Sequence, residues 1–122
     1  MAQVSTDAAS GPQVLVLRLS GALDYESEDI VSQQLRHHIA LSDAPDIVLN
    51  LADVSFCDST GLNTLLRAFH AARDRDAHLT LAEAPAHLAR ILAVTGIDKV
   101  MLITGTNEPP AEPEGLGRLA PS

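Results

Sequence analysis

The sequence has little positive charge. Only 8 of its 122 residues are lysine or arginine, whereas 16 are aspartate or glutamate, so the formal net charge is −8. A surface that binds nucleic acid needs clustered basic side chains to neutralise phosphates, and here the 8 are scattered along the chain. The charge balance therefore argues against a nucleic-acid partner and favours a protein partner or a cationic surface.

The sequence also lacks long apolar runs and has almost no cysteine. No segment approaches the roughly 20 apolar residues that span a bilayer, and the first residues lack the basic start and apolar core of a secretion signal. A single cysteine, Cys57, cannot form an internal disulfide or a multi-cysteine metal site, which agrees with a reducing compartment. We therefore expect a cytoplasmic protein that does not contact a membrane.

The composition predicts one globular domain with a modest core, since 46% of the residues are hydrophobic and 20% are charged. We place this domain at residues 1–104. Residues 1–11 within it could form a weak edge strand, turning back into the next strand, or could be disordered. Residues 105–122 are rich in Pro, Gly and Glu and predict a flexible tail.

Within the domain, the hydrophobic period alternates between that of strands and that of helices. Strands are predicted at 14–19, 46–51, 78–81 and 100–103, and helices at about 25–39, from the 58–62 region to about 73, and from 85 to 96. Gly21 is expected to turn the chain after the first of these strands, Asp24 to cap the first helix and Pro85 to lie in the first turn of the third. The two strands at 14–19 and 46–51 are predicted to be buried mostly on both faces. This alternation predicts an α/β fold, a mostly parallel or mixed sheet of four to five strands covered by helices.

A cluster of polar side chains lies where the strand at 46–51 gives way to the second helix, in the stretch ValSerPheCysAspSerThrGlyLeu at 54–62. Capping alone explains much of it, because Asp, Ser and Thr are ordinary residues at helix starts and Gly61 eases a tight entry. One cap needs only one side chain, however, and Ser55, Asp58, Ser59 and Thr60 crowd within a single turn. The excess suggests a functional site.

Four kinds of chemistry could use this turn. A serine hydrolase would need a base near the hydroxyl and usually a Gly-Xaa-Ser-Xaa-Gly elbow; the elbow is absent and none of the five histidines has a recognisable spacing from Ser59. An aspartic protease would need a shorter loop in two copies, and a phosphate-binding loop would need more glycines and a lysine. In the fourth case the serine is itself a substrate, modified by a kinase.

Three segments give the span from about Val14 to Ile103 a resemblance to the STAS domain family of bacterial anti-sigma factor antagonists. They are LeuSerGlyAlaLeuAsp at 19–24, the stretch from Ile47 to Leu62, and LeuAlaValThrGlyIleAspLysValMetLeuIle at 92–103. The resemblance implies that Ser59 is phosphorylated by a partner anti-sigma factor, and that Asp24 lies near this serine. It also implies a partner-binding surface made by Asp24, Asp58, Ser59, Thr60, Gly61 and Leu62, although the helical stripe favours core packing for Leu62.

By the same resemblance, the unmodified protein binds an anti-sigma factor serine kinase of the GHKL type and frees a sigma factor, and a protein phosphatase resets the serine. The protein itself would have no catalytic residues, cofactor or metal. An alternative is a STAS scaffold or adaptor that is not phosphorylated. The chain departs from the family pattern at Ala22, where Glu is usual, and at Asn50 and Ala52, where Asp and Ser are usual. The change at Ala22 removes a polar surface group and could alter the choice of partner.

Cys57 stands directly before Asp58, where the family carries an apolar residue. We expect it to be a small buried hydrophobic residue and not a redox sensor. His37 and His38 are adjacent on a predicted helix, so their side chains point about 100° apart and cannot chelate one metal ion together.

Overall fold

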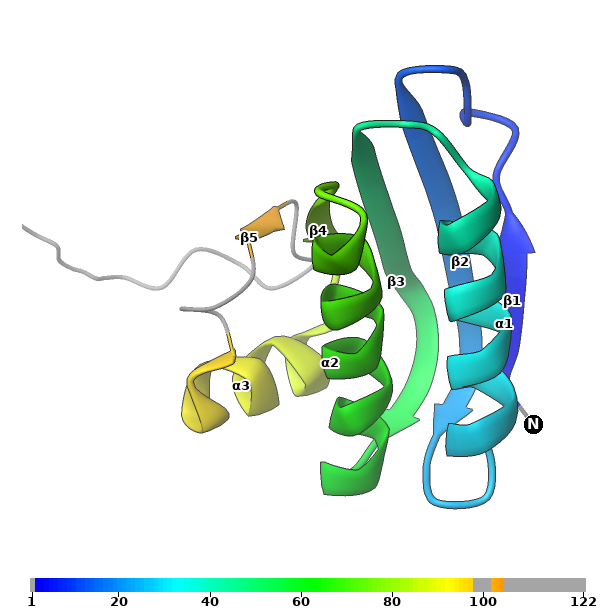
Figure 1. Ribbon diagram of the computed structural model, residues 1–122. Helices are drawn as coiled ribbons and strands as arrows, with labels where there is room; N and C mark the ends of the chain where they lie inside the picture. Colours follow the sequence, from blue (N-terminus) through cyan, green and yellow to red (C-terminus); the bar gives the residue numbers. More distant parts are fainter. Residues whose placement is uncertain (1, 98–101, 105–122) are drawn as a thin grey trace, which may run out of the picture.

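The computed structural model describes residues 2–97 and 102–104, in which five strands and three helices alternate after an initial hairpin (Figure 1). The strands are β1 (Gln3–Thr6), β2 (Val14–Leu23), β3 (Asp46–Cys57), β4 (His78–Ala82) and β5 (Leu102–Thr104). The helices are α1 (Glu28–Leu41), α2 (Ser59–Asp74) and α3 (Ala86–Thr95). The predicted α/β class and the order of its elements are confirmed. The predicted start of the last strand at 100–101 and the predicted tail at 105–122 lie outside the described residues.

The strands form one sheet in the order β1-β2-β3-β4-β5. β1 is antiparallel to β2, so of the two alternatives for residues 1–11 the structure shows the edge strand. Strands β2, β3, β4 and β5 run parallel to one another. Parallel strands end on the same side of a sheet. The ends of β2 and β3 therefore lie together at one edge, which we call the carboxyl edge.

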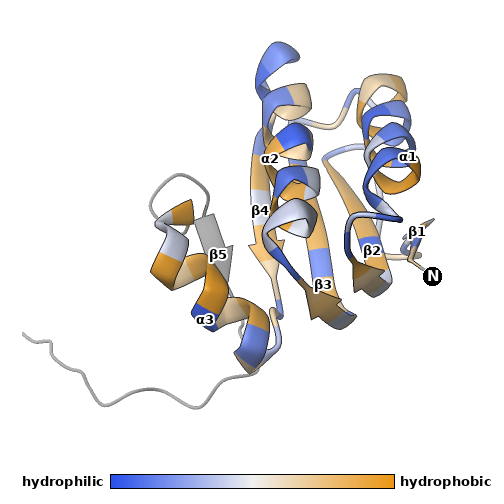
Figure 2. Cartoon of the chain, turned by 90° about the horizontal axis from the view of Figure 1, so that it is seen from below, coloured by the Kyte–Doolittle hydropathy of each residue, from blue (hydrophilic) through white to orange (hydrophobic). Residues whose placement is uncertain are grey.

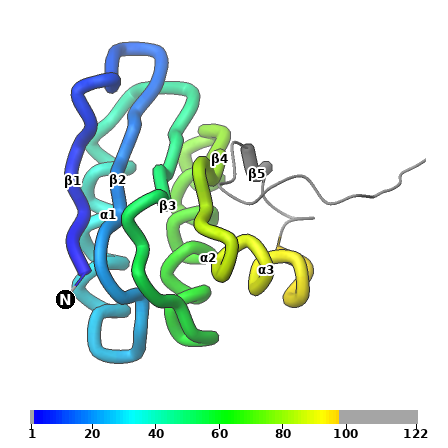
Figure 3. Tube along the Cα trace, turned by 180° about the vertical axis from the view of Figure 1, so that it is seen from behind, coloured from blue at the N-terminus to red at the C-terminus, as the bar shows by residue number. Residues whose placement is uncertain are grey.

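Helices α1 and α2 lie side by side on one face of the sheet (Figures 1 and 2). The core lies between them and the sheet and consists mainly of leucines, such as Leu17, Leu49 and Leu65, which are fully buried. Helix α3 follows β4, contacts β3 and lies outside the pair formed by α1 and α2 (Figure 3). The expectation that the first two long strands are buried on both faces is wrong: in β2, half-buried Val16 and Arg18 alternate with the buried leucines.

Strands β2 and β3 are longer than their apolar runs suggest. Gly21, expected to end the first run, lies inside β2 with a φ of 88°, and β3 continues six residues past Leu51. The pairing of β2 with β3 is irregular at two points, each with one extra residue in β3. These bulges let Leu51, Val54 and Cys57 all face the core at intervals of three, which the two-residue period of a regular strand does not allow.

Two helices begin at residues other than the predicted ones. Helix α1 starts at Glu28, three residues after the predicted start, and its N-cap is Ser27, so the prediction that Asp24 caps this helix is wrong. Pro85 is the N-cap of α3, one residue before its first turn. The predicted end of α3 at Gly96 is confirmed, because that glycine adopts the left-handed conformation with a φ of 81°. None of these helices, within residues 2–97, is long and apolar enough to cross a membrane.

Candidate functional site

The candidate site is the turn between β3 and α2, at the carboxyl edge. Asp58 directly follows β3, and Ser59 is the first residue of α2. The side chain of Ser59 is exposed and that of Thr60 is half-buried. Leu23 at the end of β2 pairs with Cys57 at the end of β3, so the loop that carries Asp24 leaves the sheet beside this turn.

Asp58 caps α2. Its Oδ1 accepts a hydrogen bond of 2.8 Å from the backbone N–H of Gly61, and its carbonyl accepts the first helical bond, from Leu62, at 3.1 Å. The backbone N–H of Asp58 in turn donates to the carbonyl of Leu23, at 3.3 Å, which ties the cap to β2. Capping thus accounts for Asp58, as the composition of the turn suggested.

Capping does not account for the two hydroxyls that follow. Among the described residues, no group makes a hydrogen bond with the side chain of Ser59 or of Thr60. The backbone N–H groups of these two residues lie in the first turn of α2, where they have no partner within the helix. The turn therefore presents a free hydroxyl next to unpaired donors and the positive end of a helix dipole.

Gly61 and Leu62 are buried. A β-carbon at Gly61 would overlap the carbonyl group of Leu23, so only glycine lets α2 approach the end of β2 this closely. Leu62 is 6% exposed and packs in the core. The placement of Leu62 agrees with the role that its helical spacing favours, and a direct partner contact by either residue stays a prediction.

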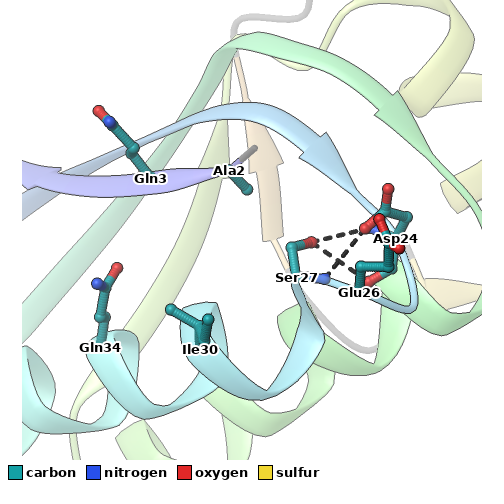
Figure 4. A pocket seen from close by; sticks show the side chains of 7 residues that line it. All are labelled: Ala2, Gln3, Asp24, Glu26, Ser27, Ile30 and Gln34. Carbon is teal, nitrogen blue, oxygen red and sulfur yellow. Dashed lines mark hydrogen bonds between the residues drawn. The ribbon is translucent and has the colours of Figure 1, made fainter.

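Asp24 is fixed by Ser27 in a tight turn before α1 (Figure 4). Its Oδ1 accepts from the N–H of Ser27 at 3.1 Å, and its own N–H donates to Ser27 Oγ, also at 3.1 Å. Ser27 Oγ donates to the carbonyl of Ala22 at 2.9 Å. Between Asp24 and Ser59 the structure shows neighbouring loops and no direct hydrogen bond.

Two further polar residues near this edge, Ser27 and Arg67, are not among the residues predicted from the sequence. Ser27 precedes Glu28 and Asp29, and a serine followed by acidic residues is a usual sign of a helix start that could have identified it. Arg67, on α2, contacts Glu28 of α1 at 3.4 Å and Asp29 at 3.9 Å. No short motif predicts this pair, because the two helices meet only in the folded chain.

Cys57 is 4% exposed, and burial raises the pKa of its thiol to about 11, with a further contribution from the neighbouring charge of Asp58. The predicted burial of Cys57 is therefore confirmed, and the thiol stays protonated near neutral pH. In the described part of the chain, no group of three or more His, Cys, Asp or Glu side chains is arranged to hold a metal ion.

Comparison with known proteins identifies relatives along most of this chain. The family model described as "STAS domain" matches residues 5–108. An anti-sigma F factor antagonist of Paenibacillus polymyxa is 31% identical over 90 residues, which cover 74% of this chain and 77% of that protein.

Solved structures share the fold. An anti-sigma factor antagonist from Mycobacterium paratuberculosis superposes with a TM-score of 0.71 at 23% identity, covering 86% of this chain and 88% of that one. The Bacillus cell fate determinant SpoIIAA in its phosphorylated form has a TM-score of 0.61 at 18% identity, with coverage of 84% and 91%. At these identities the superpositions show the fold alone.

Proposed function

The chain belongs to the STAS domain family, and we propose that it acts as an anti-sigma factor antagonist whose binding to its partner is switched by phosphorylation of Ser59. The observation that carries the proposal is the position of Ser59: exposed, first in α2, directly after the capping Asp58, with a hydroxyl that no described group binds. A relative named as an anti-sigma F factor antagonist supports the function. A solved neighbour known in a phosphorylated form supports the switch.

The physical basis of the switch is charge. Phosphorylation adds about −1.5 to −2 charges and three strong acceptor oxygens at Ser59. The unpaired N–H groups and the dipole at the start of α2 stabilise those charges within this protein. The carboxylates of Asp58 and Asp24 nearby add to the negative potential at the carboxyl edge.

The proposed partner is an anti-sigma factor that is also a serine kinase of the GHKL type. Such a kinase presents its bound nucleotide phosphates to Ser59, so a phosphate already on the serine would meet like charge and lose hydrogen bonds. The unmodified protein therefore binds and the phosphorylated protein is released. In this proposal a separate phosphatase restores the serine, the cycle takes place in the cytoplasm, and this chain contributes no catalytic group.

Intact-mass spectrometry tests the proposal directly. The purified protein is incubated with ATP and candidate GHKL-type kinases from the same genome, alongside Ser59→Ala and Thr60→Ala. We expect one phosphate on the wild type and on Thr60→Ala, and none on Ser59→Ala. A binding measurement on the phosphorylated wild type should then show a Kd at least about tenfold above that of the unmodified protein.

The controls separate the switch from its alternative. Thr60→Ala is the matched variant, because Thr60 is the neighbouring hydroxyl in the same turn. Binding to a kinase without any phosphate transfer would contradict the switch and favour a STAS scaffold or adaptor. A phosphate on Ser59→Ala would move the modification to another residue.

A further inference from the structure

Within residues 2–97, the carboxyl edge carries most of the exposed large apolar side chains. Within residues 2–97, five such side chains are exposed, namely Tyr25 (79%), Ile30 (59%), Leu41 (72%), Phe56 (51%) and Val94 (82%). Tyr25 follows the end of β2, Phe56 lies next to the end of β3, and Ile30 lies in the first turn of α1, so all three belong to the carboxyl edge at which the Ser59 turn lies. The chain has only three aromatic residues, so two of its three aromatics are exposed beside one turn.

These three residues, which we call the apolar rim, lie on different elements of the carboxyl edge. Phe56 pairs with Ala22 and precedes Cys57, which faces the core, so its side chain points to the face of the sheet away from α1 and α2. Ile30 lies in the first turn of α1, on the helix side. Tyr25 lies between them in the loop after β2.

A pocket adjoins the rim on the helix side (Figure 4). It has a volume of about 420 Å³ and lies between the start of β1 and the first turn of α1. Ala2 and Ile30 supply apolar walls, and Asp24 and Glu26 supply acidic ones. The pocket thus adjoins the loop of Asp24, which leaves the sheet beside the Ser59 turn.

We propose that the apolar rim, Tyr25, Ile30 and Phe56, is the main binding surface for the anti-sigma factor. In this complex the anti-sigma factor contacts the carboxyl edge on both faces of the sheet. This inference rests on the proposed function. Ser59 switches the binding, and the apolar rim supplies the surface to which the partner binds. Aromatic side chains exposed next to a functional turn are typical of the few residues that dominate binding energy in interfaces.

The charges of this edge define what the partner must offer. Among the described residues, Asp24, Glu26 and Asp58 lie at this edge without a salt bridge, whereas Glu28 and Asp29 are paired with Arg67. The complementary surface therefore consists of apolar sockets bordered by lysine or arginine side chains. Phe56 points to the face of the sheet away from α1 and α2. To contact it, the partner's surface must extend around the end of β3.

The test measures the Kd of Phe56→Ala, Tyr25→Ala and the double variant for the kinase that modifies Ser59. Leu41→Ala is the matched control, since Leu41 is an equally exposed apolar residue at the other end of α1, about three turns from Ile30. We expect Phe56→Ala to raise the Kd at least about tenfold and Leu41→Ala to change it by less than about twofold. Equal melting temperatures would show that the variants are folded.

A second readout follows Tyr25 itself. Because it is the single tyrosine of the chain, labelling with 3-fluorotyrosine gives one fluorine resonance. Partner binding should shift or broaden that resonance, and phosphorylation of Ser59 should restore the unbound signal.

The outcomes distinguish the two proposals. If the wild type binds no candidate kinase, the proposed function fails and the rim fails with it. If the wild type binds and is phosphorylated on Ser59 but Phe56→Ala behaves like Leu41→Ala, only the apolar rim is wrong. The apolar rim is also wrong if the wild type self-associates and Phe56→Ala abolishes this self-association without weakening kinase binding. The rim would then be an interface between copies of this chain.

Discussion

The carbonyl of Leu23 lies against the α-carbon of Gly61, leaving no room for a side chain between the end of β2 and the first turn of α2. The same carbonyl accepts the N–H of Asp58. One residue of β2 therefore fixes both the cap and the first turn of α2, and places Asp24, its neighbour in sequence, beside the Ser59 turn.

Gly61→Ala is expected to destabilise the protein. Alanine normally favours a helix over glycine by about 1 kcal/mol, but here its β-carbon would overlap backbone atoms of Leu23, which cannot move aside as a flexible side chain could. Overpacking of this kind costs about 1–3 kcal/mol. Urea denaturation should show a net loss of about 1 kcal/mol or more in the free energy of unfolding.

Gly11→Ala is the matched control for that measurement. A β-carbon at Gly11 would meet no atom within 4 Å. Its free energy of unfolding should stay the same or rise by up to about 1 kcal/mol, because alanine restricts the unfolded chain. An equal effect of both substitutions would contradict the close approach of Gly61 to Leu23.

Asp58→Ala should weaken the start of α2. The substitution leaves the N–H of Gly61 without its acceptor, and loss of an N-cap costs about 0.5–2 kcal/mol. Asp58→Asn retains an acceptor oxygen and should keep most of the stability. Thermal unfolding followed by circular dichroism compares the two, and a similar loss for both would show that the charge, and not the cap hydrogen bond, is what matters.

Thr64→Val should leave the protein equally stable or more stable. Thr64 is 1% exposed and its hydroxyl has no hydrogen-bond partner among the described residues. Valine has nearly the same shape, and removing an unsatisfied buried polar group recovers up to about 1–3 kcal/mol of desolvation cost. Thr95→Val, at an exposed hydroxyl that already donates to Ile91, is the control and should change little. A destabilised Thr64→Val would indicate a hidden partner for the buried hydroxyl.

Stability should fall at alkaline pH because of Cys57. Burial raises the pKa of its thiol to about 11, above the value of 9.0 for an unperturbed cysteine, so the folded protein holds this proton more tightly than the unfolded chain does. The resulting stabilisation is complete below pH 9 and is lost as the pH rises towards about 11. Chemical denaturation of wild type and Cys57→Ala across this range isolates the effect, since other titrating groups are common to both. If the free energy of unfolding changes with pH in the same way for both proteins, this prediction is wrong.

At the candidate site, the sequence identified the turn and its chemistry but not every contact. Asp58 and Gly61 could be predicted because a cap and a tight entry are local features of the chain. The Asp24 pairing with Ser27, and the Arg67 contacts to α1, could not. They depend on how the β2–α1 loop closes and on which faces of α1 and α2 meet.

The ends of β2 and β3 show the same limit. Apolar runs stop at Leu19 and Leu51, and Gly21 is a reasonable turn residue on local grounds. Pairing between the two strands nevertheless carries both of them on to Leu23 and Cys57, since each satisfies the backbone groups of the other and the bulges in β3 keep its apolar residues on the core side.

Local patterns in the chain specify the α/β class, the order of the elements and the position of Ser59 at a helix start, because hydrophobic period and capping residues act over a few neighbours. How far the strands run, which face of the sheet the helices cover, and the position of the Asp24 loop beside the Ser59 turn depend on the folded chain. These features arise from pairing between strands that are distant in the chain, which no local pattern encodes.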